Sequence, residues 1–402
     1  MPTVNLWATD GYVGTPDGKN VYIWGFTDKE GGAAQLPGPA IIVKQQPYLI
    51  PTVVTVNLTN KLAEPVSLVF PGQGEVRVNG QPAQPQYQGD KLVSFINHAL
   101  PGETITYQVT LTGPGTFLYE SGTYPHRQVQ MGLHGAMIVR PPDYLGLHPE
   151  KQTAYGRNTG TEFDREYLLV LGEIDPGLHQ SVEHGLPYDT GEFNPRYRTI
   201  NGKCWNGTVS GDGDGHLPAR PYGSMIMMEP GEKVLLRCAG AGFESHPLHP
   251  HGNHARVVGL DGKLLQNCGI SGTTDLSFKR FTILTGPGQT CDLIYTWTGP
   301  GYEPDTNPIP TRLPQIRKMA LAPTGLTMWS GSPYLGVKGE LPGEIESCNQ
   351  IGEYHFMLNS HGVPGITGQG AFPGGMPAMI AVYPAGTLEP HHGMLPTESH
   401  TP

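Results

Sequence analysis

The chain has 402 residues, only 15% of them charged, and a formal net charge of −10 at pH 7. The negative charge argues against nucleic acid or an anionic membrane surface as a partner, and no apolar run approaches the length of a membrane-spanning helix. The 56 glycines and 40 prolines are spread between short apolar runs, a pattern typical of many short strands joined by tight turns.

The first third of the chain predicts a β-sandwich. Its short apolar runs are separated by turn residues, and they lie at 4–8, 20–24, 36–43, 51–59, 66–70, 92–96, 103–111, 115–122 and 135–139. Seven or more such strands favour a Greek-key arrangement. We therefore expect a first domain over residues 1–145, followed by a polar, glycine-rich linker over residues 146–164.

A second series of strands opens at Glu166-Tyr-Leu-Leu-Val-Leu171 and predicts a second domain over residues 165–384. The segment 211–215 alternates glycine with aspartate and is too short for a calcium-binding EF-hand loop, so we interpret it as a flexible loop. The polar segment 385–402 predicts a disordered tail.

The N-terminus and the cysteines bear on the compartment. Residues 1–7 have neither a basic region nor an apolar region of a signal peptide. The five cysteines all lie in the second half, and their spacing excludes a zinc ribbon or c-type haem attachment; they are Cys204, Cys238, Cys268, Cys291 and Cys348. Up to two disulfides are possible. The low charge and loop-rich β character favour an extracytoplasmic protein, periplasmic or secreted, whose signal peptide lies outside this sequence.

The two halves of the chain repeat one pattern. Residues 64–72 match 244–252 in step, and residues 117–122 match 356–361. Each match is followed by a glycine-rich loop and an apolar strand, so two copies of one sandwich are the simplest interpretation. In this register His246, His249 and His251 align with Val66, Val69 and Pro71, Asn359 aligns with Glu120, and His361 aligns with Gly122.

The segment 244–254 holds four of the 16 histidines. His249 and His251 stand two residues apart, so on a strand they point to the same face. Imidazole is the commonest protein ligand for copper and zinc, which makes this cluster a candidate metal site. The alternative is a surface loop that happens to be rich in histidine.

At these residues the chain resembles the multicopper oxidase family, whose units are cupredoxin domains. His246-Pro-Leu-His249-Pro-His251-Gly is similar to the family's His-Pro-x-His-x-His-Gly motif, and further similarity lies at 36–41, 115–119 and 372–376. The resemblance covers nearly the whole chain and implies an all-β fold of two Greek-key, cupredoxin-like β-sandwich domains. It also implies that His246 would bind a type 1 copper, His249 a type 2 copper and His251 one copper of the type 3 pair.

The departures from the family weigh more than the matches. The position of the type 1 cysteine falls on Ser360, and the next type 1 histidine falls on Gly365. A blue copper site needs the thiolate for its covalency and as the electron path. The histidine pairs of the family's first domain fall on Val69, Pro71, Glu120 and Gly122. Of the eight histidines expected around a trinuclear cluster, three can be placed: His249, His251 and His361. We therefore do not expect a four-electron oxidase.

Two positions in the first domain are secondary candidates. His126 and Met131 follow Ser121 with a spacing that resembles the ligand loop of small blue copper proteins, but Ser121 again replaces the cysteine, so we interpret the loop as a relic. Glu120 would enter the histidine site if the first domain of one chain met the second domain of another. The alternative for Glu120 is an ordinary solvated carboxylate.

Three hypotheses about the function follow. The first is a scaffold or interaction protein that kept the fold and lost the redox centres. The second is a protein or enzyme with one copper or zinc ion on His249, His251 and His361, a set that leaves a fourth position open for water; without metal, these histidines would simply pack together. The third is a copper oxidase whose ligands are aligned differently. The resemblance to two-domain members also implies a homo-oligomer, for which a trimer is one possibility. As an interaction protein, the chain would in addition bind a protein partner whose identity is unknown.

Overall fold

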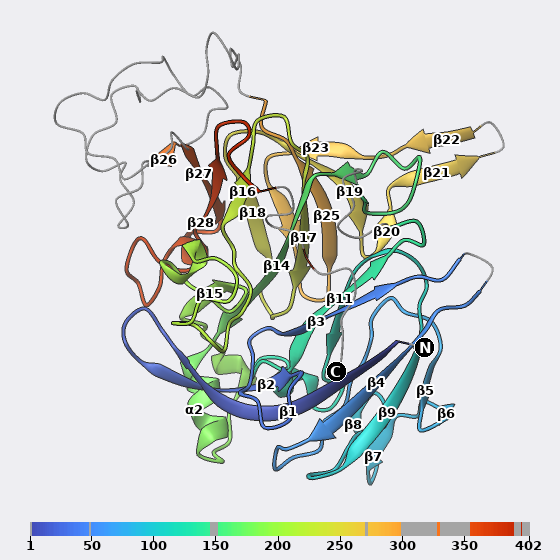
Figure 1. The fold of residues 1–402 in the computed structure, drawn as a ribbon. Coiled ribbons are helices and arrows are strands. Elements are labelled where there is room, and N and C mark those ends of the chain that lie inside the picture. Colours follow the sequence, from blue (N-terminus) through green and yellow to red (C-terminus); the bar gives the residue numbers. More distant parts are fainter. Residues whose placement is uncertain are drawn as a thin grey trace.

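The structure, a computed structural model, describes residues 2–47, 50–144, 152–269, 272–298, 328–329, 354–389 and 395. Nearly all regular elements in these residues are strands (Figure 1). The helical segments are short: α1 (Pro125–Gln128), α2 (Pro176–Glu183), and the 3₁₀ turns η1 (Thr190–Glu192), η2 (Gly207–Val209) and η4 (Val363–Ile366). None of the described helices has the length and apolarity needed to span a bilayer.

The first domain consists of two sheets packed face to face. One has the order β2-β1-β4-β9-β5-β6 and the other β10-β11-β3. The larger sheet contains β1 (Thr3–Gly14), β2 (Asn20–Thr27), β4 (Val53–Asn60), β5 (Val76–Val78), β6 (Gln81–Pro82) and β9 (Thr104–Thr110). The smaller contains β3 (Gly38–Lys44), β10 (Gly115–Glu120) and β11 (His134–Arg140). Side chains of β4 alternate between half-buried and buried, because only one face of that strand meets the core.

The second domain has the same two-layer plan. One sheet has the order β15-β14-β17-β25-β19-β20 with β23 on β19, and the other β16-β28-β27-β18-β24 with β26 on β27. The first contains β14 (Arg165–Ile174), β15 (Tyr197–Ile200), β17 (Val234–Gly240), β19 (Ala255–Leu260), β20 (Lys263–Leu264), β23 (Phe278–Arg280) and β25 (Thr290–Tyr295). The second contains β16 (Ile226–Met228), β18 (His246–Pro250), β24 (Ile283–Thr285), β26 (Met328–Trp329), β27 (Tyr354–Ser360) and β28 (Ala378–Val382). The predicted pair of β-sandwiches is therefore confirmed.

Short hairpins lie outside these sheets: β7 (Gln86–Gln88) with β8 (Lys91–Ser94), β12 (Gln152–Thr153) with β13 (Glu162–Phe163), and β21 (Gln266–Gly269) with β22 (Gly272–Asp275). The β12–β13 hairpin corrects the expected linker over 146–164. Phe163 is buried, and the Tyr155 hydroxyl donates to Asp292 Oδ2 at 2.5 Å. Residues 152–164 are therefore part of the packed second domain, and 145–151 lie outside the described residues.

The start of the expected disordered tail is also ordered. The Glu229 carboxylate accepts hydrogen bonds from the backbone N–H groups of Gly386, Thr387 and Leu388, at 2.8, 2.7 and 2.7 Å. Leu395 packs against an apolar cluster between the domains. These contacts correct the prediction for the first residues after 384, and the rest of the tail lies outside the described residues.

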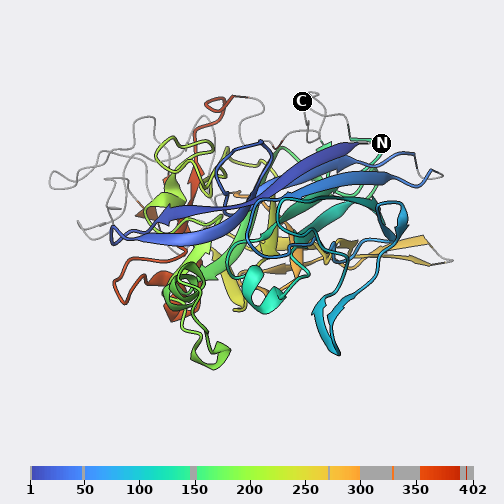
Figure 2. The same cartoon turned by 90° about the horizontal axis from the view of Figure 1, so that it is seen from below.

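Strands that meet between the domains are buried on both faces. Every residue of β11, β14, β17 and β25 is buried, because one face packs in its own domain and the other against the neighbouring domain. The long β1–β2 hairpin of the first domain also reaches α2 of the second (Figures 1 and 2). The two sandwiches are thus joined over a wide apolar interface.

A buried charge network crosses this interface. Arg140 of β11 makes a bidentate pair with Glu166 of β14, at 2.5 and 2.7 Å, and Arg237 Nε reaches the same carboxylate at 2.5 Å. Arg237 also contacts Asp292 at 3.3 Å. Burial alone would raise the pKa of Glu166, but the two guanidinium groups lower it below its usual value. Because buried charges are costly unless paired, the network fixes how the domains dock.

Candidate functional site

Three neighbouring strands position the candidate histidines. β18 pairs with β27 on one side and β24 on the other, with His249 opposite Asn359. His361 follows β27 directly, and its N–H donates to the Pro247 carbonyl at 2.8 Å. Since His249 and His251 share one face of the chain, the structure brings His249, His251 and His361 together; we call them the histidine trio.

The rings of the histidine trio touch. The centroids of His249 and His251 lie 4.7 Å apart at 86°, and those of His249 and His361 lie 4.8 Å apart at 83°. His361 is exposed, whereas His249 and His251 are half-buried. His249 Nδ1 lies 2.8 Å from Thr282 Oγ1, and the ring of Phe281 covers one side of His249 at 5.7 Å. Sequence reasoning missed Thr282 and Phe281, since nothing local links them to the motif.

Burial keeps two rings of the trio neutral. It lowers the pKa of His251 to about 4, and the neighbouring His249 lowers it further, whereas a hydrogen bond to the Asn359 side chain opposes this shift. Burial, together with repulsion from His361, also lowers the pKa of His249. A neutral imidazole is the form that binds a metal ion, so His249 and His251 are in the ligand state at neutral pH.

The spacing of the trio fits a metal ion better than its ring orientation does. Metal–nitrogen bonds of about 2.0–2.1 Å place the centroids of coordinating imidazoles roughly 5 Å apart, close to the distances above. The rings stand edge to face, however, and among the described residues no group of three or more His, Cys, Asp or Glu is arranged to hold a metal ion. Rotation of the side chains would be needed to point three nitrogens at one ion.

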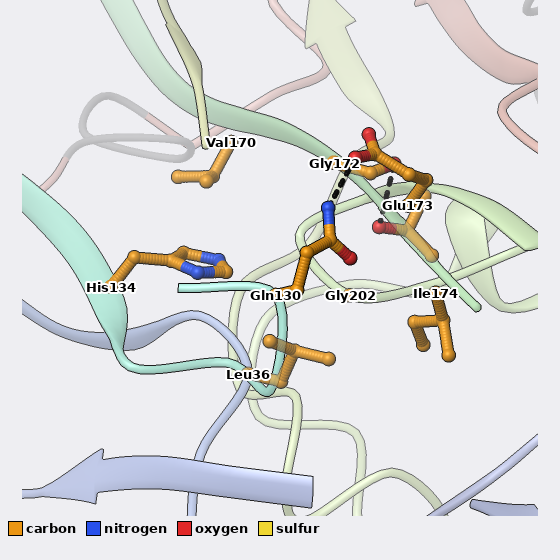
Figure 3. Close-up of a pocket in the computed structure, with 9 residues that line it drawn as sticks. Leu36, Gln130, His134, Val170, Gly172, Glu173, Ile174 and Gly202 are labelled. Atoms are coloured by element: carbon orange, nitrogen blue, oxygen red, sulfur yellow. Dashed lines mark hydrogen bonds between the residues drawn. The ribbon is translucent and has the colours of Figure 1, made fainter. Parts of the chain in front are cut away.

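His246 lies apart from the trio, although it belongs to the same motif. It is buried with Leu248 and Pro250 on the opposite face of β18, and its Nε2 lies 3.2 Å from Glu173 Oε2. Glu173 also accepts from Gln130 Nε2 at 2.5 Å. Figure 3 shows this carboxylate beside a cavity of about 10 Å³ between the domains, which His134 also lines. His246 therefore has a carboxylate partner that the sequence did not reveal.

Ser360 and Gly365 lie in direct contact. Ser360 is the residue on which the resemblance predicts the type 1 cysteine to fall, and a Cβ placed on Gly365 would lie 2.5 Å from both Cβ and Oγ of Ser360. There is consequently no room for a ligand side chain at residue 365.

The first domain carries the same strand register without the histidines. Val69 pairs with Glu120, just as His249 pairs with Asn359, which confirms the alignment of the two halves. A Cβ on Gly122 would lie 2.6 Å from Val69 Cγ1, so these two residues fill the place that His249 and His361 occupy in the second domain. Burial raises the pKa of the half-buried Glu120.

The loop of His126 and Met131 does not assemble into a second cluster. His126 is exposed and Met131 is fully buried. The Ser121 hydroxyl donates to Gln128 Oε1 at 2.6 Å, so Gln128 occupies the space beside the serine. The remaining cysteines that the structure describes with side chains, Cys204, Cys238 and Cys291, are buried free thiols.

Known proteins place this geometry in context. Residues 27–144 match the family model of multicopper oxidases. An L-ascorbate oxidase of Cucumis sativus is 26% identical over 317 residues, which are 74% of this chain and 46% of that protein. One from Cucurbita pepo var. melopepo is 27% identical over 293 residues, covering 68% and 48%. The chain thus spans about half the length of these curated relatives.

Solved structures agree in fold. A blue copper oxidase from Nitrosomonas europaea has a TM-score of 0.59 at 20% identity, covering 94% of this chain and 85% of that chain. The multicopper oxidase mgLAC has a TM-score of 0.60 at 17% identity, covering 96% and 88%. The all-β, cupredoxin-type fold and the resemblance to the multicopper oxidase family are both confirmed.

Proposed function

We propose that this relative of the multicopper oxidases is an extracytoplasmic scaffold or interaction protein and not a four-electron oxidase. The observation that carries the proposal is Ser360, packed against Gly365 at the type 1 position. A hydroxyl oxygen supplies neither the covalent copper–sulfur bond nor the electron path that a blue copper site needs. The apolar packing of Val69 and Gly122 in the first domain supports the same conclusion.

Copper loading tests this function. The purified chain is incubated with Cu²⁺, excess metal is removed, and the absorption spectrum and the uptake of O₂ with a phenolic substrate are measured. We expect no strong band at about 600 nm, which reports a copper–thiolate bond, and no oxygen uptake. Either signal would overturn the proposal.

A second function is favoured by the spacing of the histidine trio and by the lowered pKa values of His249 and His251: binding of a single copper or zinc ion. The hydrogen bond of His249 Nδ1 to Thr282 would leave Nε2 for the metal, and His251 and His361 would complete a three-imidazole set. A bound ion would act as a Lewis acid on a water molecule in the open position. The exposed side of His361 gives solvent access to that position.

Calorimetric titration with Zn²⁺ and Cu²⁺ tests metal binding. We expect close to one ion per chain, lost in His249→Ala and retained in His126→Ala, which removes an exposed histidine of the first domain. Binding that is absent from the native chain, or unaffected by His249→Ala, would remove this second function.

We further propose a homo-oligomer, a trimer in the simplest ring, in which the first domain of one copy covers the trio of the next. Large apolar side chains are exposed on the two surfaces that would meet in such a ring. They are Phe281 (57%) and Leu284 (62%) near the trio, and Leu92 (46%) and Phe95 (58%) near Gly122 in the first domain. Such patches favour protein contacts. Light scattering should give a mass of about three chains, reduced to one chain in Leu284→Lys; a native monomer would refute the ring.

A further inference from the structure

A second hollow lies away from the histidine trio. A cavity of about 290 Å³ is formed between the turn that joins β1 to β2 and helix α2, with Tyr197 and Gln369 completing its wall. Figure 1 shows α2 beside this hairpin. The volume is close to the lower end of the range for small-molecule sites, about 300–1,000 Å³. Residues from both domains therefore build a cavity large enough for a small ligand.

The charged groups around this cavity already have partners. Lys19 Nζ lies 3.1 Å from Asp17 Oδ2, and Glu183 Oε1 accepts the hydroxyl of Tyr12 at 2.5 Å. His179 is buried, which lowers the pKa of its ring, and its Nδ1 donates to the Tyr22 carbonyl at 2.5 Å. Lys19 and Asp17 thus form an ion pair, whereas the Glu183 carboxylate keeps its negative charge, because a hydrogen bond from a hydroxyl group does not neutralise it.

Neutral hydrogen-bonding groups remain free. Asn20 at the start of β2 and Gln180 in α2 both line the cavity, and no hydrogen bond within the described residues uses their side-chain amides. Gln369 uses its Nε2 on the Tyr197 hydroxyl at 3.0 Å, which leaves its carbonyl oxygen available. Each amide group provides both donors and an acceptor. A hydroxyl group also donates and accepts hydrogen bonds, so amides and hydroxyl groups pair well.

Apolar side chains line the cavity as well. Val21, Tyr22 and Pro176 line the same cavity, and Tyr12 packs edge to face on Tyr22 with centroids 5.5 Å apart. Tyrosine rings present a flat apolar face next to a polar edge. A ligand that carries hydroxyl groups on its rim and C–H groups on its faces would match this surface.

We propose that this cavity binds a neutral, hydroxyl-rich ligand of the size of one or two sugar rings. An anionic ligand is disfavoured because Asp17 and Glu183 flank the cavity and the chain carries a net charge of −10. A cationic ligand would meet the positive charge of Lys19, which lines the same cavity. The site involves no residue of the trio, so it is independent of any metal.

The test is saturation-transfer NMR and calorimetry on the full chain with D-glucose and cellobiose as probes. We expect binding of at least one of them, weakened about tenfold in Gln180→Leu, since one or two hydrogen bonds are lost. Gln81→Leu, which removes an exposed amide of β6, should bind like the native chain. Thermal melting verifies that both variants are folded.

Three outcomes would overturn the proposal. They are the absence of binding of both sugars to the native chain, equal binding by Gln180→Leu and the native chain, and tighter binding of D-glucuronate or D-glucosamine than of D-glucose. The last result would mean that a charged ligand is preferred.

Discussion

The two domains place equivalent strands at equivalent positions and line them with different side chains. In the second domain His249 and His361 touch across β18 and the end of β27. In the first domain Val69 and Gly122 fill the corresponding space by direct contact. The register of the strands is the same in both, because it depends on core residues on the opposite face. His249 and His361, like Val69 and Gly122, lie on the other face, and these side chains can therefore differ without loss of the fold.

The largest effect is expected when the buried charge network between the two domains is disrupted. Glu166→Gln leaves the buried Arg140 and Arg237 without their shared carboxylate, and such a loss is expected to reduce the free energy of unfolding by about 3–5 kcal/mol. Chemical denaturation measures the change. Glu162→Gln is the matched control, because its contact with Lys233 at 3.4 Å is only partly buried. Equal effects of the two substitutions would contradict the role of the buried network.

The second prediction concerns pH. Burial lowers the pKa of His134, at the domain interface, from 6.5 to about 4, so between these values the unfolded chain binds the proton and the folded chain does not. Stability should therefore fall as pH drops from 6.5 towards 4, by about 3 kcal/mol for this group. Melting curves of the native chain and His134→Phe test this: the variant should lose less stability over that range. Identical pH profiles would disprove it.

The third prediction concerns metal binding at the histidine trio, which the first domain lacks. If the second domain binds Zn²⁺ and the first does not, an excess of about 100 times the dissociation constant should stabilise the chain by about 2.7 kcal/mol. The rise in melting temperature should vanish in His251→Ala and persist in Val69→Ala. A rise that survives His251→Ala would place the ion elsewhere.

The smallest effect is expected when a histidine is introduced into the first domain at the position that corresponds to His361. Gly122→His would place a side chain against Val69 Cγ1, and overpacking of this kind costs about 1–3 kcal/mol. The double variant Val69→Ala/Gly122→His should recover part of that loss, because the smaller side chain makes room. Denaturation of both variants measures the difference, and a stability equal to that of native protein in the single variant would show that the space is already open.

The sequence by itself determined the two β-sandwiches, the register of the repeat and the pairing of His249 with His251 on one face. These features follow from local periodicity: a strand alternates its faces every residue, and a repeated pattern carries its alignment with it. The correspondence of Ser360 with the family's type 1 cysteine stays a prediction of the resemblance.

Only the tertiary structure decided the partners of the buried groups. His246 meets Glu173, Arg140 meets Glu166, and Glu229 binds the start of the tail. These contacts join residues between 26 and 159 positions apart. No short-range pattern encodes such a contact, because it is formed when sheets pack against each other and buried polar groups must find hydrogen bonds there.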